Sequence, residues 1–130
     1  MKKYDNNAFF WQKVDTLFLL GRVNIEKHKG DTHPIYANMI YPVDYGHLNE
    51  TLSITDKGLS VYVGTRRPAT VTSLIVAVDI LEKSMDVKML VGCTEEETND
   101  ILHFLNQSEF HKTVLINRGN EIPVWGFTED

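Results

Sequence analysis

Two stretches of the chain carry apolar residues at helical spacing. Residues 7–20 form the first, and Gly21 follows them as a stop signal. Residues 94–106 form the second, which begins with Thr94 and Glu97 at the spacing of a capping box. We therefore predict a helix at each of these positions. The predicted apolar face of the first helix consists of Phe10, Val14, Leu17 and Phe18.

Between the two helices the pattern changes to that of β-strands. Val23 and Ile25 alternate with polar neighbours, which is typical of a half-buried strand. Residues 71–81 are rich in β-branched side chains, and the polar stretch 82–85 after them indicates the turn of a hairpin. The predicted strands cover residues 22–28, 35–41, 59–63, 71–81, 86–92 and, after the second helix, about 112–118.

The order of these elements predicts an α+β fold in one domain over residues 1–130. Strands and helices do not alternate in the way that builds parallel sheets, so we expect an antiparallel sheet. Closure of such a sheet over about 22–92 would give a small, OB-like β-barrel with an N-terminal and a C-terminal helix.

Composition narrows the class of protein. The net charge is −5 without a concentrated basic face, which argues against a nucleic-acid partner. No run of apolar residues is long enough to cross a membrane. Cys93 is the single cysteine, so an internal disulfide is impossible and a reducing, cytoplasmic setting fits.

The first candidate site is the run Tyr41-Pro42-Val43-Asp44-Tyr45-Gly46-His47. Tyrosine hydroxyls can donate hydrogen bonds to phosphate oxygens, and Gly46 permits a tight backbone turn. The competing interpretation is a strand end whose aromatic rings pack in the core.

The second candidate site surrounds the predicted hairpin turn. Asp86 and Lys88 are two residues apart on a strand and therefore share a face. With Asp79 and Glu82 nearby, the oxygens suit Mg²⁺, and the lysine suits a phosphate. The alternative is an ordinary charged hairpin tip. The histidines 28, 33, 47, 103 and 111 are scattered without a metal-binding spacing.

The order of these motifs resembles the soluble family I inorganic pyrophosphatases. The matching stretches are YPVDYGHLNETLS, LSVYVG and IVAVDILEKSMDVKML, followed by the helix. The resemblance implies Mg²⁺-dependent hydrolysis of pyrophosphate on a small closed β-barrel. It implies catalytic roles for Asp86 and Lys88, and substrate binding by Arg22, Tyr41, Tyr45 and Lys88. It also implies metal ligation by Asp86 and, with it, Glu82, Asp56 and Asp79.

The match is weakest at the metal ligands of the family. Thr55, Lys57 and Ser60 fall where the family has the aspartates of its DGDxxD turn, and Asp56 lies one place away. Leu81 replaces another aspartate, with Glu82 next to it. Neutral hydroxyls are weak ligands and a lysine repels a cation, so we expect weak, altered or absent activity. The alternatives are a noncatalytic module for a small phosphate-containing anion, or an assembly protein that forms a homo-oligomer.

Overall fold

The computed structural model describes residues 5–53 and 55–120, so the predicted domain span of 1–130 extends beyond the described residues at both ends. Neither described helix is long and apolar enough to cross a membrane. The elements are α1 (Ala8–Leu20), β1 (Val23–Lys27), β2 (Asp44–Leu48), β3 (Leu59–Val63), β4 (Val71–Asp79), β5 (Ser84–Val91), α2 (Glu95–Leu105) and β6 (His111–Asn117).

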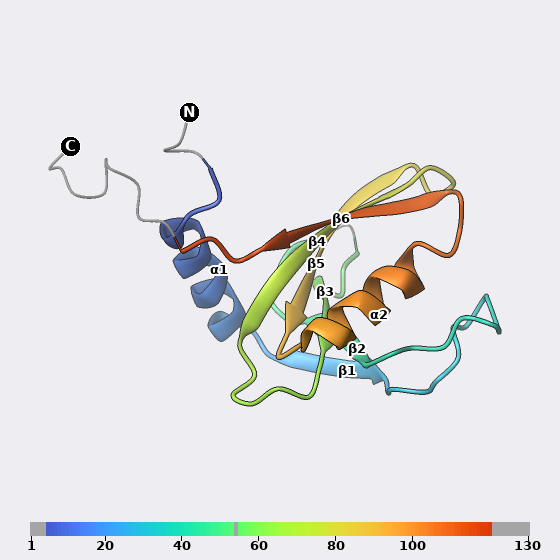
Figure 1. Cartoon of the computed structure of the whole chain (residues 1–130), viewed down its shortest axis with the longest axis horizontal. Coiled ribbons are helices and arrows are strands. Elements are labelled where there is room, and N and C mark those ends of the chain that lie inside the picture. Colours follow the sequence, from blue (N-terminus) through green and yellow to red (C-terminus); the bar gives the residue numbers. More distant parts are fainter. Residues whose placement is uncertain (1–4, 54, 121–130) are drawn as a thin grey trace, which may run out of the picture.

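The strands form one six-stranded sheet in the order β1-β2-β3-β5-β4-β6 (Figure 1). The α+β class is confirmed, but the closed antiparallel barrel is not. The β3–β5 pair is parallel, and no ladder joins β1 to β6 within the described residues. After α2 the chain returns as β6 and pairs with β4. Strand β6 thus occupies the edge of β4 with which β1 would have to pair to close a barrel.

The segment between β1 and β2 departs from the prediction. Residues 35–41 were expected to form a strand, but they form a loop that contains only the isolated bridge between Thr32 and Ile40. The backbone of this loop bonds to itself, since Tyr41 N–H donates to the Asp31 carbonyl and His33 N–H to the Met39 carbonyl. The strand begins only at β2, within the tyrosine-rich run.

Adjacent residues on the central strands pack on opposite faces of the sheet, as strand geometry requires. On one face, Ile75 and Leu90 pack with Ile101 and Phe104 of α2. On the other, their neighbours Leu74 and Met89 pack with Trp11 and Val14 of α1. Figure 1 shows the two helices on different sides of the sheet. The domain therefore has two hydrophobic clusters rather than one barrel interior.

Helix α1 meets the sheet through part of the predicted face, since Val14 and Phe18 pack there as expected, but Trp11 joins them in the core. Trp11 is fully buried, whereas Phe10, expected in the core, is 49% exposed. The Trp11 indole N–H donates to the Asn6 side chain, and the Arg118 guanidinium lies 5.1 Å from the centre of the Trp11 ring. A bidentate ion pair with Asp15 holds Arg118 in place. These contacts make Trp11 the residue that anchors α1.

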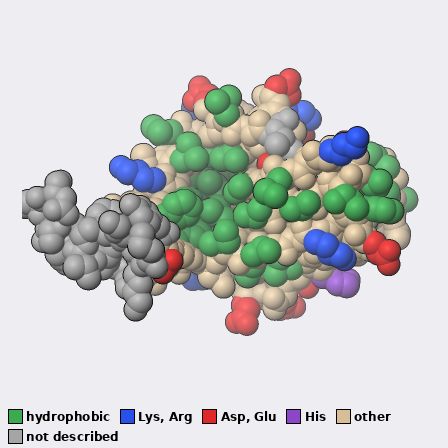
Figure 2. Space-filling view, turned by 90° about the horizontal axis from the view of Figure 1, so that it is seen from above, with side chains coloured by type: hydrophobic (Ala, Val, Ile, Leu, Met, Phe, Trp, Pro, Cys, Tyr) green, Lys and Arg blue, Asp and Glu red, His purple; other side chains and the backbone are tan. Residues whose placement is uncertain are grey.

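Beyond α1, the same face of the sheet remains uncovered within the described residues. Figure 2 looks onto this face and shows hydrophobic side chains gathered across it. The exposed apolar band consists of Val78 on β4, Met85 and Val87 on β5, and Val114 on β6.

The anchoring of α1 gives a stability prediction. Trp11→Ala should lower the free energy of unfolding by about 3–5 kcal/mol, because it leaves a large cavity in the core. The neighbouring Phe10→Ala is the matched control and should cost about 1 kcal/mol or less, because that ring is half exposed. Urea denaturation followed by circular dichroism measures both. Equal losses in the two variants would contradict this orientation of α1.

Candidate functional site

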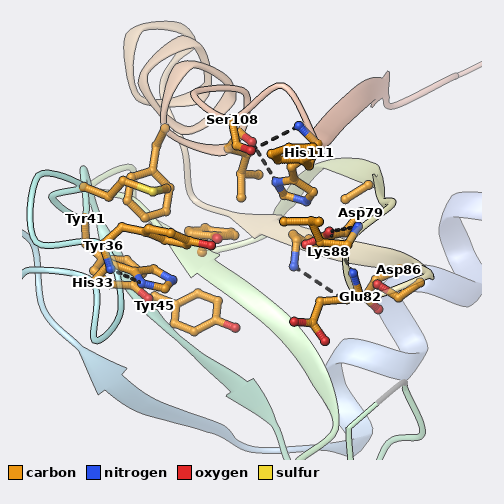
Figure 3. A pocket seen from close by; sticks show the side chains of 18 of the residues that line it. His33, Tyr36, Tyr41, Tyr45, Asp79, Glu82, Asp86, Lys88, Ser108 and His111 are labelled. Carbon is orange, nitrogen blue, oxygen red and sulfur yellow. Dashed lines mark hydrogen bonds and ion pairs between the residues drawn. The ribbon is translucent and has the colours of Figure 1, made fainter.

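A pocket of about 530 Å³ opens where α2 ends over the sheet. Aromatic side chains, with Tyr36, Tyr41 and Tyr45 among them, lie on one side of the pocket in Figure 3. Charged side chains from β4, β5 and the turn between them lie on the opposite side. The pocket therefore combines the two clusters that the sequence had indicated separately.

Six of the eight predicted site residues line this pocket: Tyr41, Tyr45, Asp79, Glu82, Asp86 and Lys88. The other two do not. Arg22 is exposed in the connection between α1 and β1, and Asp56 is exposed in the turn before β3. The predicted substrate contact of Arg22 and metal contact of Asp56 therefore find no support in this pocket. Both predictions depended on aligning loops, whose positions the local sequence does not determine.

Asp86 and Lys88 project from β5 into the pocket and pair with each other. The Lys88 Nζ lies 3.4 Å from Asp86 Oδ2, and the side chains are only 13% and 10% exposed. The Ser53 hydroxyl donates to the other oxygen, Asp86 Oδ1, at 2.9 Å. The expected common face of these two residues is confirmed. Because both charges are largely removed from water, neither can be lost alone without a large cost.

Tyr45 is held by a chain of polar side chains behind the pocket. Its hydroxyl lies 3.2 Å from Ser60 Oγ on β3 and 3.5 Å from the buried His47 Nε2. The other ring nitrogen of His47 contacts the Glu26 carboxylate, which can only accept, so this nitrogen carries a proton. Gly46, between the two residues, lets β1 approach closely, since a Cβ there would meet the Asn24 carbonyl. This explains the glycine better than the predicted tight turn.

Burial sets the protonation of the tyrosines. It raises the pKa of Tyr41 to about 12, and the nearby Tyr45 and Glu26 act in the same direction. Burial also raises the pKa of Tyr45, against the opposing hydrogen bond from Ser60. The fully buried Tyr62 has a strongly raised pKa for the same reason. All three phenols are therefore protonated near neutral pH, so they can donate hydrogen bonds and cannot act as bases.

Two histidines line the pocket, although the sequence analysis did not identify them as site residues. His33 Nδ1 accepts from the backbone N–H groups of Ile35 and Tyr36, so the ring proton lies on Nε2. Burial and then the charge of Lys27 lower the pKa of His33, which keeps it neutral. His111 Nδ1 lies 2.7 Å from the Leu105 carbonyl and therefore donates to it. Their separation by 78 positions (111 − 33) leaves no local signal for the pair.

The carboxylates of the pocket do not form a two-magnesium centre. Within residues 5–53 and 55–120, no group of three or more His, Cys, Asp or Glu side chains is placed to hold a metal ion. Asp86 is occupied by Lys88 and Ser53, and Asp79 Oδ1 accepts from the backbone N–H groups of Leu81 and Glu82. Since Mg²⁺ needs several free oxygens in near-octahedral geometry, this donor set does not fit it.

Comparisons with models of known families and with curated proteins find no match to this chain.

The pairing of Glu26 predicts a pH-dependent stability. Burial raises the pKa of Glu26, but the hydrogen bonds from His47 and Lys57 outweigh it, so the pKa lies below the ordinary 4.5. A lowered pKa stabilises the fold above pH 4.5, and this contribution disappears as the pH falls through the folded-state pKa. Glu26→Gln should therefore cost about 1 kcal/mol of unfolding free energy at pH 7 and almost nothing at the acid end.

Chemical denaturation of both proteins across this pH range tests the assignment, with Glu50→Gln as the control for an exposed carboxylate. A Glu26→Gln deficit that stays constant down to the acid end would show that the carboxylate charge is not what stabilises this network.

Proposed function

We propose that this domain binds a small phosphate-bearing molecule in the pocket, as the resemblance of its motifs to the family I inorganic pyrophosphatases implies. The observation that carries the proposal is Lys88, which lines the pocket with a side chain that is 13% exposed and an ammonium group paired with Asp86. A lysine kept in a cavity at this cost is a ready partner for a phosphate oxygen.

Neutral hydrogen-bond donors around the cavity also support phosphate binding. The protonated hydroxyls of Tyr41 and Tyr45 belong to side chains that line the pocket, as does the Nε2–H of His33. Uncharged donors can bind phosphate oxygens without the desolvation cost of burying further charged groups. Phosphate recognition by Lys88 and tyrosines is therefore the part of the predicted function that has most support.

The charge balance argues against efficient pyrophosphate turnover. Asp79, Glu82 and Asp86 share the charged side of the pocket with one lysine, so the carboxylates outnumber the ammonium group by three to one. A polyanion such as pyrophosphate is repelled there unless cations accompany it. We therefore propose binding, rather than efficient turnover, as the main role. A cytoplasmic setting also stays a proposal, as the sequence indicated.

Magnesium-dependent hydrolysis of pyrophosphate is the second candidate. The observation in its favour is that three of the four predicted metal ligands share one pocket. A role in assembly or homo-oligomer formation also stays a proposal, and the exposed apolar band supports it.

Loss of Lys88 should weaken phosphate binding. We expect Lys88→Met to reduce the affinity for inorganic phosphate and phosphate monoesters at least about tenfold, because a buried charged hydrogen bond is lost. Isothermal titration calorimetry measures the change. Lys57→Met is the matched control, since Lys57 is exposed and pairs with Glu26 outside the pocket.

Because Lys88→Met leaves the Asp86 charge unpaired, the double variant Asp86→Asn/Lys88→Met is measured beside it, with thermal melts of both. Affinity that survives in the folded double variant would rule out Lys88 as the phosphate contact.

Hydrolysis is tested by phosphate release from pyrophosphate with Mg²⁺ or Mn²⁺. We expect no release above background, because the donor set does not fit a two-metal centre. Metal-dependent release that Asp86→Asn abolishes and the exposed Asp56→Asn preserves would establish the second candidate instead.

A further inference from the structure

We infer that the natural ligand of this pocket is a phosphate ester that carries a planar ring, of the nucleoside monophosphate class, rather than free pyrophosphate. This inference rests on the proposed phosphate-binding function and specifies its ligand. Three independent properties of the cavity support it: its size, the aromatic groups at its rim, and the distribution of its charges.

The cavity is large for an ion of two phosphate groups. Its volume of about 530 Å³ lies within the range of roughly 300–1,000 Å³ that is typical of pockets for drug-sized ligands. A pyrophosphate at Lys88 would leave the aromatic side of the cavity filled only with water. A ligand that reaches from the lysine to that side uses the whole pocket.

Two aromatic rings at the cavity are half exposed. Tyr36, in the loop before β2, is 50% exposed, and Phe110, just before β6, is 47% exposed. Single exposed aromatic residues are common on protein surfaces, but these two come from separate segments and line the same pocket. Accessible aromatic rings at a pocket can stack with nucleobases and other flat heterocycles.

The aromatic side continues inward as a series of rings. The Tyr36 ring centre is 5.2 Å from that of His33, and His33 stacks on Tyr41 at 6.1 Å with nearly parallel planes. Tyr41 in turn stacks on Tyr45 at 5.5 Å. Neither the tyrosines nor the neutral His33 brings a formal charge to this side. It therefore offers a surface for an apolar ring, and Figure 3 shows it facing the charged groups.

The charged side of the pocket suits a ligand that carries hydrogen-bond donors in addition to a phosphate. Within the described residues, the Glu82 side chain has no hydrogen-bond or ion-pair partner, and Asp79 lies beside it in the same pocket. Carboxylates accept hydrogen bonds from sugar hydroxyls and amino groups but repel phosphate oxygens. A phosphate ester of a hydroxylated sugar offers these donors, which pyrophosphate lacks.

The test compares ligands that differ by the ring alone. Isothermal titration calorimetry of the full chain is carried out with AMP, GMP, CMP and UMP, and in parallel with ribose 5-phosphate and inorganic phosphate. We expect at least one nucleotide to bind about tenfold or more tightly than ribose 5-phosphate, which is the gain that stacking of one base supplies. Tyr36→Ala should remove most of that gain.

Phe10→Ala is the matched control, because Phe10 is 49% exposed on α1, away from the pocket, and should leave every affinity unchanged. Equal affinity for the nucleotides and ribose 5-phosphate would overturn the ring inference and leave the phosphate proposal standing. A gain that Tyr36→Ala leaves intact would overturn it as well. Absence of binding by every phosphate compound would overturn both proposals.

Discussion

A short helix covers one face of a sheet whose central strands are much longer. Helix α2 has 11 residues and is about 16 Å long, while β4 has nine residues and extends about 30 Å. The helix packs on Ile75 at the middle of β4 and on Leu90 near the end of β5, so the end of β4 and the start of β5 project past it. The uncovered ends on this face form the floor of the pocket, with Ala77, Asp79, Asp86 and Lys88.

The same geometry explains why the two faces of these strand ends differ. On the pocket face, Asp86 and Lys88 neutralise each other, and such a pair is tolerated at low exposure because each charge has a partner. On the opposite face, their neighbours Met85 and Val87 continue an apolar pattern past the end of α1. Strand alternation thus places a polar cavity and an apolar surface back to back, separated by one layer of backbone.

The candidate site illustrates where sequence reasoning succeeds. Asp86 and Lys88 are two residues apart, and β-strand geometry alone places this pair on one face. Sequence reasoning fails for residues whose position depends on the conformation of a loop. The loop that contains His33 and Tyr36 was expected to be a strand, and Asp56 was expected at the site on the basis of a turn that lies elsewhere. Backbone hydrogen bonds between residues several positions apart shape such loops, and local pattern does not reveal them.

The sequence by itself determined the two helices, most of the strands and the α+β class, because amphipathic period, capping and β-branched runs are local signals. It also determined the charged pair on β5. Only the tertiary structure decided that the sheet stays open, because the pairing of β6 with β4 joins residues about 40 positions apart. It likewise decided that Trp11, not Phe10, enters the core, since the rotation of a helix with apolar residues on several sides is set by the surface that receives it. The pocket belongs to the same category, since its walls come from a loop, two strands and a helix end that meet only in the folded chain.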